Sequence, residues 1–257
     1  MTDREARSPQ RRGAFIALLL GGLLAFAGFA ALGVWQLQRL SWKTDLIARV
    51  DQRLKAAPVA APGPSAWPAL NRNEDEYRRV ELHGRFIHEL ETPVQASTEL
   101  GAGYWLLTPL LTDEGWWVIV NRGFVPPERR NPTSRAAQEP AEPQHLTGLL
   151  RLTEPGGSLL QHNDAGAGRW YSRDVQAIAA ARGLGGPQRP GAVAPYFVDA
   201  SAVPGAENAW PRAGLTVVNF RNNHLGYALT WFALAAMVAA ALGYLLFIER
   251  PRVHQRD

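Results

Sequence analysis

Two long stretches of the chain, one near each end, contain apolar residues without a single charge. Ala14 to Val34 is 21 residues long, which as an α-helix measures about 31 Å and matches a bilayer's hydrocarbon core. Leu225 to Ile248 is 24 residues long and lies between Arg221 and Glu249, so it can span a bilayer with some tilt. Globular cores seldom contain apolar stretches of this length. The pattern therefore predicts two transmembrane helices.

The first span has one alternative interpretation, a cleaved export signal. Arg11 and Arg12 form a basic segment before it, and Ala25 to Ala27 has the small-residue spacing of a cleavage site. A twin-arginine signal is a variant of the same idea. The apolar stretch nevertheless continues to Val34, further than the apolar part of a signal peptide usually extends, which favours a retained span.

The region between the spans has a different pattern, with short apolar stretches separated by turns. Strands are predicted where apolar positions alternate or where aromatic and β-branched residues gather: Tyr77 to His88, Tyr104 to Leu111, Trp116 to Val120, His145 to Leu152, Tyr196 to Asp199 and Leu215 to Phe220. The turn at Asp113 to Gly115 predicts a hairpin between the second and third of these strands. One helix is predicted at Arg173 to Arg182, with Ser172 as its N-cap and Asp174 in its first turn.

Two further segments connect the first span to these strands. Trp35 to Val50 keeps a helical pattern, so the first helix is expected to continue into water, and the Pro-rich stretch from Ala56 to Ala69 predicts an extended linker. The expected fold is a membrane protein with two transmembrane α-helices flanking an antiparallel β-rich α+β extracytoplasmic domain. Its expected parts are a tail (1–13), a span (14–34), the extracytoplasmic domain (35–221), a second span (222–248) and a tail (249–257).

The basic residues near the spans predict the orientation in the membrane. Seven flank the outer ends of the spans, namely Arg4, Arg7, Arg11, Arg12, Arg250, Arg252 and Arg256. Five flank the inner ends, namely Arg39, Lys43, Arg49, Arg212 and Arg221. The difference favours both termini in the cytoplasm and the central domain outside. The formal net charge of +4 and the scattered basic residues do not indicate nucleic-acid binding.

The sequence contains no motif of a common enzyme class. HExxH, Walker, GxSxG and GxGxxG patterns are absent, and the carboxylates of the central region are few and not evidently paired. We therefore expect no enzymatic activity and no turnover of a small-molecule substrate. The chain has no cysteine, which excludes disulfides and covalent c-type haem, and its only sulfur beyond Met1 is Met237, which disfavours a Cu(I) site.

Polar and aromatic residues gather at the outer end of the second span. His224, Tyr227 and Trp231 follow the helical spacing i, i+3 and i+7 and are expected on one face. His224 could offer its imidazole to a metal or a haem iron near the membrane surface, where ionisable residues are commonly functional. The alternative is an interfacial belt in which these side chains lie at the headgroup level.

Small residues in both spans predict close packing of the two helices. They are Gly21, Ala25 and Gly28 in the first span and Ala235, Ala239 and Gly243 in the second. Packing would bring Trp35 and Arg39 near His224 at the outer ends of the spans. Arg39 and Arg221 lie at a matching depth and could pair with carboxylates such as haem propionates, or simply extend to the lipid headgroups.

Five motifs occur in order along nearly the whole chain: LGVWQLQRLSWKTDLI (Leu32 to Ile47), YRRVELHGRF (Tyr77 to Phe86), VNRGFVP (Val120 to Pro126), RWYSRD (Arg169 to Asp174) and NNHLGYALTWFALA (Asn222 to Ala235). In this order, with a span at each end, they resemble the surfeit-locus-one (Shy-type) family of assembly factors for haem-copper cytochrome c oxidase. The resemblance implies help in maturing oxidase subunit I by holding or delivering haem a during cofactor insertion. Subunit I would then be a protein partner, with haem a synthase as a further candidate.

The resemblance also implies a role for His224. Bacterial members of the family have a histidine associated with haem a at this place, so His224 is the expected axial ligand of the haem iron, and Trp231 looks like its aromatic partner. The full expected haem a site lies between the two helices and comprises His224, Trp231, Tyr227, Trp35, Arg39 and Arg221. The implied location is the bilayer of a bacterial inner membrane, with the central domain in the periplasm.

Two other functions stay open at this point. One is a scaffold that stabilises oxidase assembly intermediates without binding haem. The other is a membrane-tethered module that binds an envelope ligand unrelated to respiration.

Overall fold

The computed structural model describes residues 9–135, 142–157, 161–205, 209–216 and 222–249, in two compact units. The first unit, called here the helical unit, combines the chain up to Ala48 with the chain from Asn219 onward. The second, called the barrel domain, comprises Arg49 to Val218. Each unit is described by itself.

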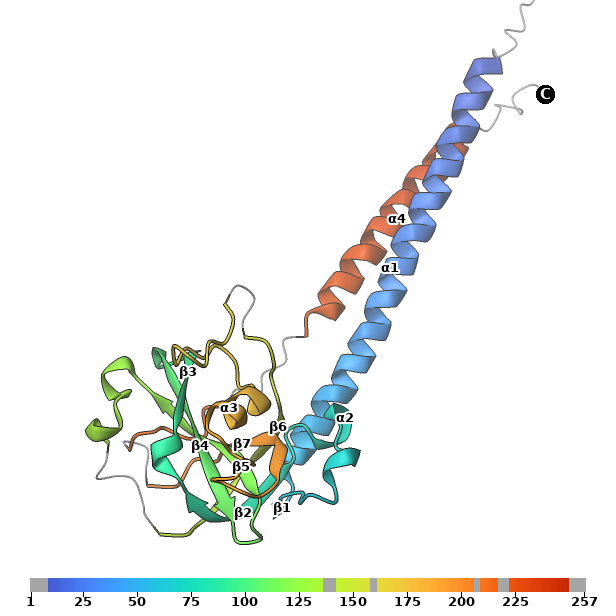
Figure 1. The fold of residues 1–257 in the computed structure, drawn as a ribbon. Coiled ribbons are helices and arrows are strands. Elements are labelled where there is room, and N and C mark those ends of the chain that lie inside the picture. Colours follow the sequence, from blue (N-terminus) through green and yellow to red (C-terminus); the bar gives the residue numbers. More distant parts are fainter. Residues whose placement is uncertain (1–8, 136–141, 158–160, 206–208, 217–221, 250–257) are drawn as a thin grey trace, which may run out of the picture. The chain divides into compact units, whose positions relative to one another are not determined.

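Two long helices form the helical unit (Figure 1). Helix α1 is Pro9–Lys55, whose last residues belong to the barrel domain, and helix α4 is His224–Glu249. Both are long and apolar enough to cross a membrane. In the most apolar 18-residue segment of α1, 0% of the residues are buried, and in that of α4, 6% are buried. The core helix of a soluble protein is mostly buried. These features indicate a membrane protein. Helix α1 continues well past Val34, as expected.

Seven strands form one sheet in the barrel domain (Figure 1). They are β1 (Val59–Ala60), β2 (Arg79–Phe86), β3 (Thr92–Thr98), β4 (Gly101–Thr112), β5 (Trp117–Val125), β6 (Gln144–Leu152) and β7 (Val193–Ala200). Their order is β1-β2-β6-β7-β5-β4-β3, and an additional pairing of β2 with β4 closes five of them into a barrel. Most pairs are antiparallel, as expected, but β1 with β2 and β5 with β7 are parallel, so the sheet is mixed.

Short helices decorate the barrel. Two are α-helical, α2 (Arg72–Asp75) and α3 (Val175–Ala181), and four are 3₁₀ turns, η1 (Trp67–Ala69), η2 (His88–Leu90), η3 (Pro127–Arg129) and η4 (Pro132–Ser134). The predicted cap of α3 is wrong by two residues. Asp174 is the N-cap, and its carboxylate accepts from the Ala177 amide, while Ser172 accepts from the Gly157 amide instead. Asp and Ser are equally good caps, so the sequence alone could not separate them.

Five of the six predicted strands are present, as β2, β4, β5, β6 and β7, with the hairpin between β4 and β5. The sixth, at Leu215 to Phe220, is not confirmed, because residues 215 and 216 are not in a strand and the others lie outside the described residues. Strand β3 was not predicted, since its polar sequence and Pro93 obscure any alternation. It pairs only with β4 at the end of the sheet, where a proline is tolerated.

Apolar residues cover both faces of the central strands. One cluster includes Val80, Val118 and Val198, and a second includes Ile119 and packs against Trp170 and helix α3. Every residue of β5 is buried, which explains why WWVIV is apolar throughout rather than alternating.

The Pro-rich stretch after α1 is part of the barrel domain. Val59 and Ala60 pair with β2, and Trp67 packs edge-on against Trp116 with ring centroids 5.8 Å apart. The buried Tyr196 hydroxyl donates to the Pro62 carbonyl at 2.8 Å. Burial raises the pKa of this phenol, which keeps it a donor. The segment therefore packs against the core of the barrel domain, whereas the sequence predicted an extended linker.

Closure of the barrel depends on close backbone approach at Gly84. A Cβ at this position would lie 2.2 Å from the Leu111 carbonyl oxygen, in the pairing of β2 with β4. Gly84→Ala is expected to lower the free energy of unfolding by about 3 kcal/mol, the upper part of the range for overpacking. Urea unfolding of the detergent-solubilised protein would measure this change. Gly166→Ala is the matched control, because its Cβ would meet nothing closer than 3.6 Å, and an equal loss in both variants would contradict the prediction.

Candidate functional site

The two membrane helices contact each other through small and aromatic residues. A Cβ at Gly33 would lie 2.6 Å from the Phe232 ring, so the absence of a side chain there lets the ring approach the α1 backbone. One turn earlier in α1, Phe29 stacks on Trp231 of α4, with ring centroids 5.8 Å apart and an interplanar angle of 24°. Such pairs stabilise by about 0.5–1.5 kcal/mol beyond the area they bury. The predicted contribution of small residues is thus present.

The small residues in the contact are only partly the predicted ones. Gly22, Gly33, Ala228 and Ala235 lie in or near it, whereas Gly21, Gly28, Ala239 and Gly243 are exposed. A helix turns 100° per residue, so a shift of one position moves a side chain from the contact to the outer face. Of the six predicted small residues, Ala235 is buried and Ala25 is half-buried, so most of the predicted set is wrong, and on α1 the contact includes Gly22 rather than Gly21.

His224 begins α4 and is bound to a residue of α1 (Figure 1 labels both helices). Its Nδ1 lies 2.7 Å from Oε1 of Gln36. Gln36 is only 9% exposed, and His224 is half-buried. No other partner of His224 is present among the described residues, so the imidazole Nε2 is not engaged by them. This is the geometry in which a histidine binds a metal through one nitrogen and is held by the other.

Trp231 is the second predicted residue that faces α1, through its stack on Phe29. Tyr227 does not, because it is 57% exposed. The contact face of α4 is centred near Ala228, which is 1% exposed, and Tyr227 falls at its edge. Of the three residues expected on one face of α4, His224 and Trp231 therefore contact α1, and Tyr227 lies beside this contact.

Trp35 and Arg39 lie within one turn of Gln36 in α1, and both side chains are exposed. Trp35 is 50% exposed, and the Arg39 guanidinium lies 4.8 Å from the centroid of the Trp42 ring. The residue of α1 that is hydrogen-bonded to His224 is Gln36, and the approach of Trp35 and Arg39 to His224 stays a prediction. Arg221 lies outside the described residues.

Gln36 and Phe29 are the contact residues that sequence reasoning missed. Gln36 could have been noticed, because it lies at i+3 from Gly33 and is therefore on the small-residue face rather than the polar face. Phe29 carried no such signal in a span rich in apolar residues. Among the described residues, no group of three or more His, Cys, Asp or Glu side chains could hold a metal ion.

A buried ion network in the barrel domain joins three of the five motifs. We call it the Asp199 network; it consists of Asp199, Arg151, Arg173, Glu76 and Glu154. Arg151 binds Asp199 and Glu76, each at 2.8 Å, and Arg173 binds Asp199 at 3.2 Å and Glu154 at 2.6 Å. Asn121 and Thr216 also donate to Asp199, at 2.7 and 2.9 Å.

The charges of this network are compensated, which favours a structural role. Burial alone would lower the pKa of Arg151, but Asp199 and Glu76 outweigh it and raise the pKa. The guanidinium also lies 4.7 Å from the centroid of the Tyr77 ring, the only described non-glycine residue with a positive φ, at 64°. The motif residues Tyr77, Asn121 and Arg173 thus each contact Arg151 or Asp199. This indicates that the three motifs stabilise the barrel domain.

A second polar cluster surrounds Glu91. Arg135, which is fully buried, contacts both carboxylate oxygens, at 2.6 and 3.2 Å, and Arg122 lies 3.5 Å away. Gly123 follows Arg122 with a φ of 132°, and a Cβ there would lie 2.3 Å from the Arg212 backbone. Gly123 therefore permits a backbone conformation and a close approach that a side chain would prevent.

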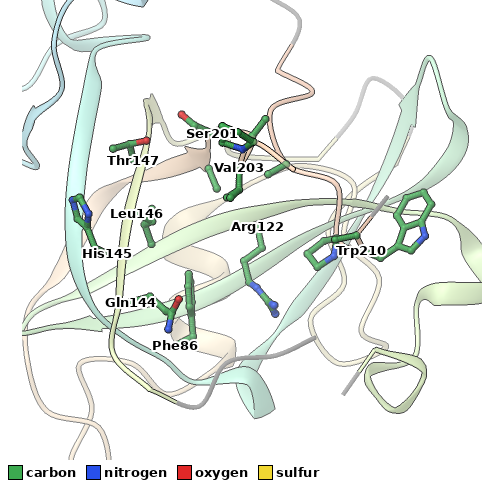
Figure 2. A pocket seen from close by; sticks show the side chains of 15 residues that line it. Phe86, Arg122, Gln144, His145, Leu146, Thr147, Ser201, Val203 and Trp210 are labelled. Atoms are coloured by element: carbon green, nitrogen blue, oxygen red, sulfur yellow. The ribbon is translucent and has the colours of Figure 1, made fainter. Parts of the chain in front are cut away.

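An open cavity of about 430 Å³ lies beside this cluster (Figure 2). Figure 2 shows Phe86 and Arg122 on one side of it and Val203 and Trp210 on another. Arg122 lies 2.9 Å from His88 and 5.5 Å from the Phe86 ring centroid, so its charge is already engaged. The cavity is largely apolar and is a candidate surface for a partner.

The fold and the site are those of a membrane protein with two paired helices and a mixed β-barrel domain. A model described as the SURF1 family matches residues 23–236. The chain belongs to the SURF1 family, whose members are linked to cytochrome oxidase assembly.

Individual relatives agree with this assignment. Surfeit locus protein 1 of Homo sapiens is 36% identical over 250 residues, which cover 90% of this chain and 75% of the relative. Surfeit locus protein 1 of Gallus gallus is 34% identical, with 91% and 75% covered. A SURF1-like protein of Monosiga brevicollis is 31% identical, with 93% and 90% covered. The similarity thus includes both helices and the barrel domain.

Proposed function

We propose that this protein is a non-catalytic assembly factor for haem-copper cytochrome c oxidase that binds haem a at the outer end of its paired helices during insertion into subunit I. The observation that carries the proposal is the contact of His224 Nδ1 with Gln36 Oε1, which leaves Nε2 for an iron. Membership of the SURF1 family supports the link to the oxidase. Haem a itself is the cargo in this proposal.

The residues near His224 suit a haem in chemistry. Haem a supplies an iron with axial positions for nitrogen ligands and two propionate groups. His224 is the proposed axial ligand, and the stacked Trp231 and Phe29 form an aromatic surface on the same side of α4. Arg39 is exposed and has no acidic partner among the described residues, so it is the proposed partner of a propionate. Trp35 and Tyr227, whose side chains are exposed, remain proposed contacts, and so does Arg221, which lies outside the described residues.

Gln36 changes where the haem is proposed to lie. It fills the contact between α1 and α4 at the level of His224, and Gly33 and Phe232 close the contact one turn away. We therefore place the haem on the surface of the helix pair around His224 rather than within the contact itself.

The barrel domain is the proposed docking surface for subunit I, with haem a synthase as a further candidate partner. It has a buried apolar core and a buried ion network, and the cavity beside Phe86 and Trp210 offers an apolar surface. Both termini are proposed to lie in the cytoplasm of a bacterial cell and the barrel domain in the periplasm, because basic residues are more numerous at the outer flanks of the spans.

Complementation of a deletion strain separates this function from the two alternatives. The His224→Ala variant is expected to restore less than about a tenth of the haem-a oxidase activity. Loss of a metal ligand lowers metal affinity at least as much as loss of a residue that is hydrogen-bonded to the ligand, which lowers it about 10- to 100-fold. Leu229→Ala, at an exposed position of the same helix, should restore full activity. Immunoblots confirm equal amounts in the membrane.

The other two outcomes contradict the proposal. Full restoration by His224→Ala would favour a scaffold that does not use haem. Normal oxidase activity in the deletion strain itself would favour an envelope module unrelated to respiration.

A further inference from the structure

Gln36 is a buried polar side chain of α1, two residues beyond the apolar stretch that ends at Val34. It is 9% exposed, and the residues beside it on the contact face of α1 are Gly33 and Phe29. Placing an amide in such surroundings costs free energy unless it is hydrogen-bonded. Its bond to His224 at 2.7 Å supplies this compensation. The same bond places a requirement on His224.

The requirement concerns which imidazole nitrogen carries the proton. The Gln36 amide is oriented with Oε1 toward Nδ1 of His224, and a carbonyl oxygen only accepts hydrogen bonds, so in this orientation Nδ1 of a neutral His224 donates to Oε1 of Gln36. In this tautomer Nε2 is unprotonated and has a free lone pair. Free imidazole has no such fixed assignment, because the tautomer is set by the hydrogen bond that the other nitrogen makes.

We propose that Gln36 is a positioning residue that holds His224 as the Nδ1-protonated tautomer and presents Nε2 to the haem iron. The inference rests on the proposed function for its last step, but the control of the tautomer is a property of the protein without haem. Ligating histidines commonly donate their other N–H to a carbonyl or carboxylate, which fixes the ring and raises its basicity. The amide of Gln36 serves that purpose here, across two helices.

The tautomer can be read directly by ¹⁵N NMR of the full-length haem-free protein, labelled at histidine and held in detergent micelles above the pH range of histidine titration. The His224 signals are assigned by their absence in His224→Ala. The wild type is expected to show Nδ1 protonated and Nε2 unprotonated. Gln36→Met, which has a similar shape and no acceptor, is expected to shift His224 to the other tautomer or to an average of the two.

Two further variants make the comparison specific. Gln36→Glu keeps an acceptor at the same place and should retain the wild-type tautomer. Gln38→Met makes the same change two residues away, at an exposed position, and should leave the His224 signals unchanged. A wild type protonated on Nε2, or a Gln36→Met variant with wild-type signals, would overturn the proposal.

Haem a titration of the same variants tests the second step. Gln36→Met is expected to bind haem a about 10- to 100-fold more weakly than the wild type, while Gln36→Glu and Gln38→Met remain close to it. Equal affinity of Gln36→Met and the wild type would overturn the positioning role. If the wild type binds no haem a while its tautomer is as expected, the proposed function fails and the control of the tautomer by Gln36 stands.

Discussion

Replacing Asp199 with alanine is expected to lower the free energy of unfolding of the barrel domain by about 3–5 kcal/mol, the range for breaking a buried ion pair from one side. Asp199 is 2% exposed and accepts bonds from Arg151, Arg173, Asn121 and Thr216. Its removal takes away the carboxylate that Arg151 and Arg173 share, although Glu76 and Glu154 remain paired with the two guanidinium groups. It also leaves the amide of Asn121 and the hydroxyl of Thr216 without the acceptor to which they donate. A loss of this size is a large fraction of a typical domain's stability.

Urea unfolding of the full-length protein in detergent, followed by the fluorescence of buried tryptophans such as Trp116 and Trp117, measures this effect. Asp164→Ala is the matched control, because Asp164 forms an exposed ion pair with Arg169. That variant is expected to unfold almost like the wild type. Similar midpoints for Asp199→Ala and the wild type would show that the network does not hold the barrel together.

Replacing His224 with alanine is expected to have the second large effect, loss of haem a binding. The variant keeps the Gly33–Phe232 and Phe29–Trp231 contacts, so the helices should still pair. It loses the only histidine among the described residues of the helical unit. Haem a affinity should fall by more than about 100-fold, beyond the effect of an outer support such as Gln36.

Titration of purified protein with haem a, followed in the Soret region, gives this affinity. His162→Ala is a suitable control, because His162 is an exposed histidine of the barrel domain. An affinity of His224→Ala within threefold of the wild type would place the haem, if bound, elsewhere.

The elements of this fold were largely predictable because each has a strong local signal. The spans follow from uninterrupted apolar stretches, and β2, β4 and β5 follow from aromatic and β-branched residues bounded by turns. Closure of the barrel was not predictable, since the contact of Gly84 with Leu111 joins distant segments and leaves no local pattern. The parallel pairing of β5 with β7 is unpredictable for the same reason.

The candidate site shows the same division. His224 and Trp231 were predicted from polar and aromatic residues at a span terminus, and both face α1. Trp35 and Arg39 were expected near His224 because close packing of the spans makes their outer ends neighbours, whereas the residue hydrogen-bonded to His224 is Gln36. A small error in the assumed rotation of one helix about its axis changes which of its side chains face the other helix. Sequence spacing alone does not determine that rotation.

The most direct test of the account is the absorption spectrum of the full-length protein purified from a host that makes haem A. The wild type is predicted to carry haem a with a Soret band, and His224→Ala prepared in the same way is predicted to carry almost none. A wild type without haem, or a His224→Ala variant with the same band, would contradict the proposal that these helices hold haem a through His224.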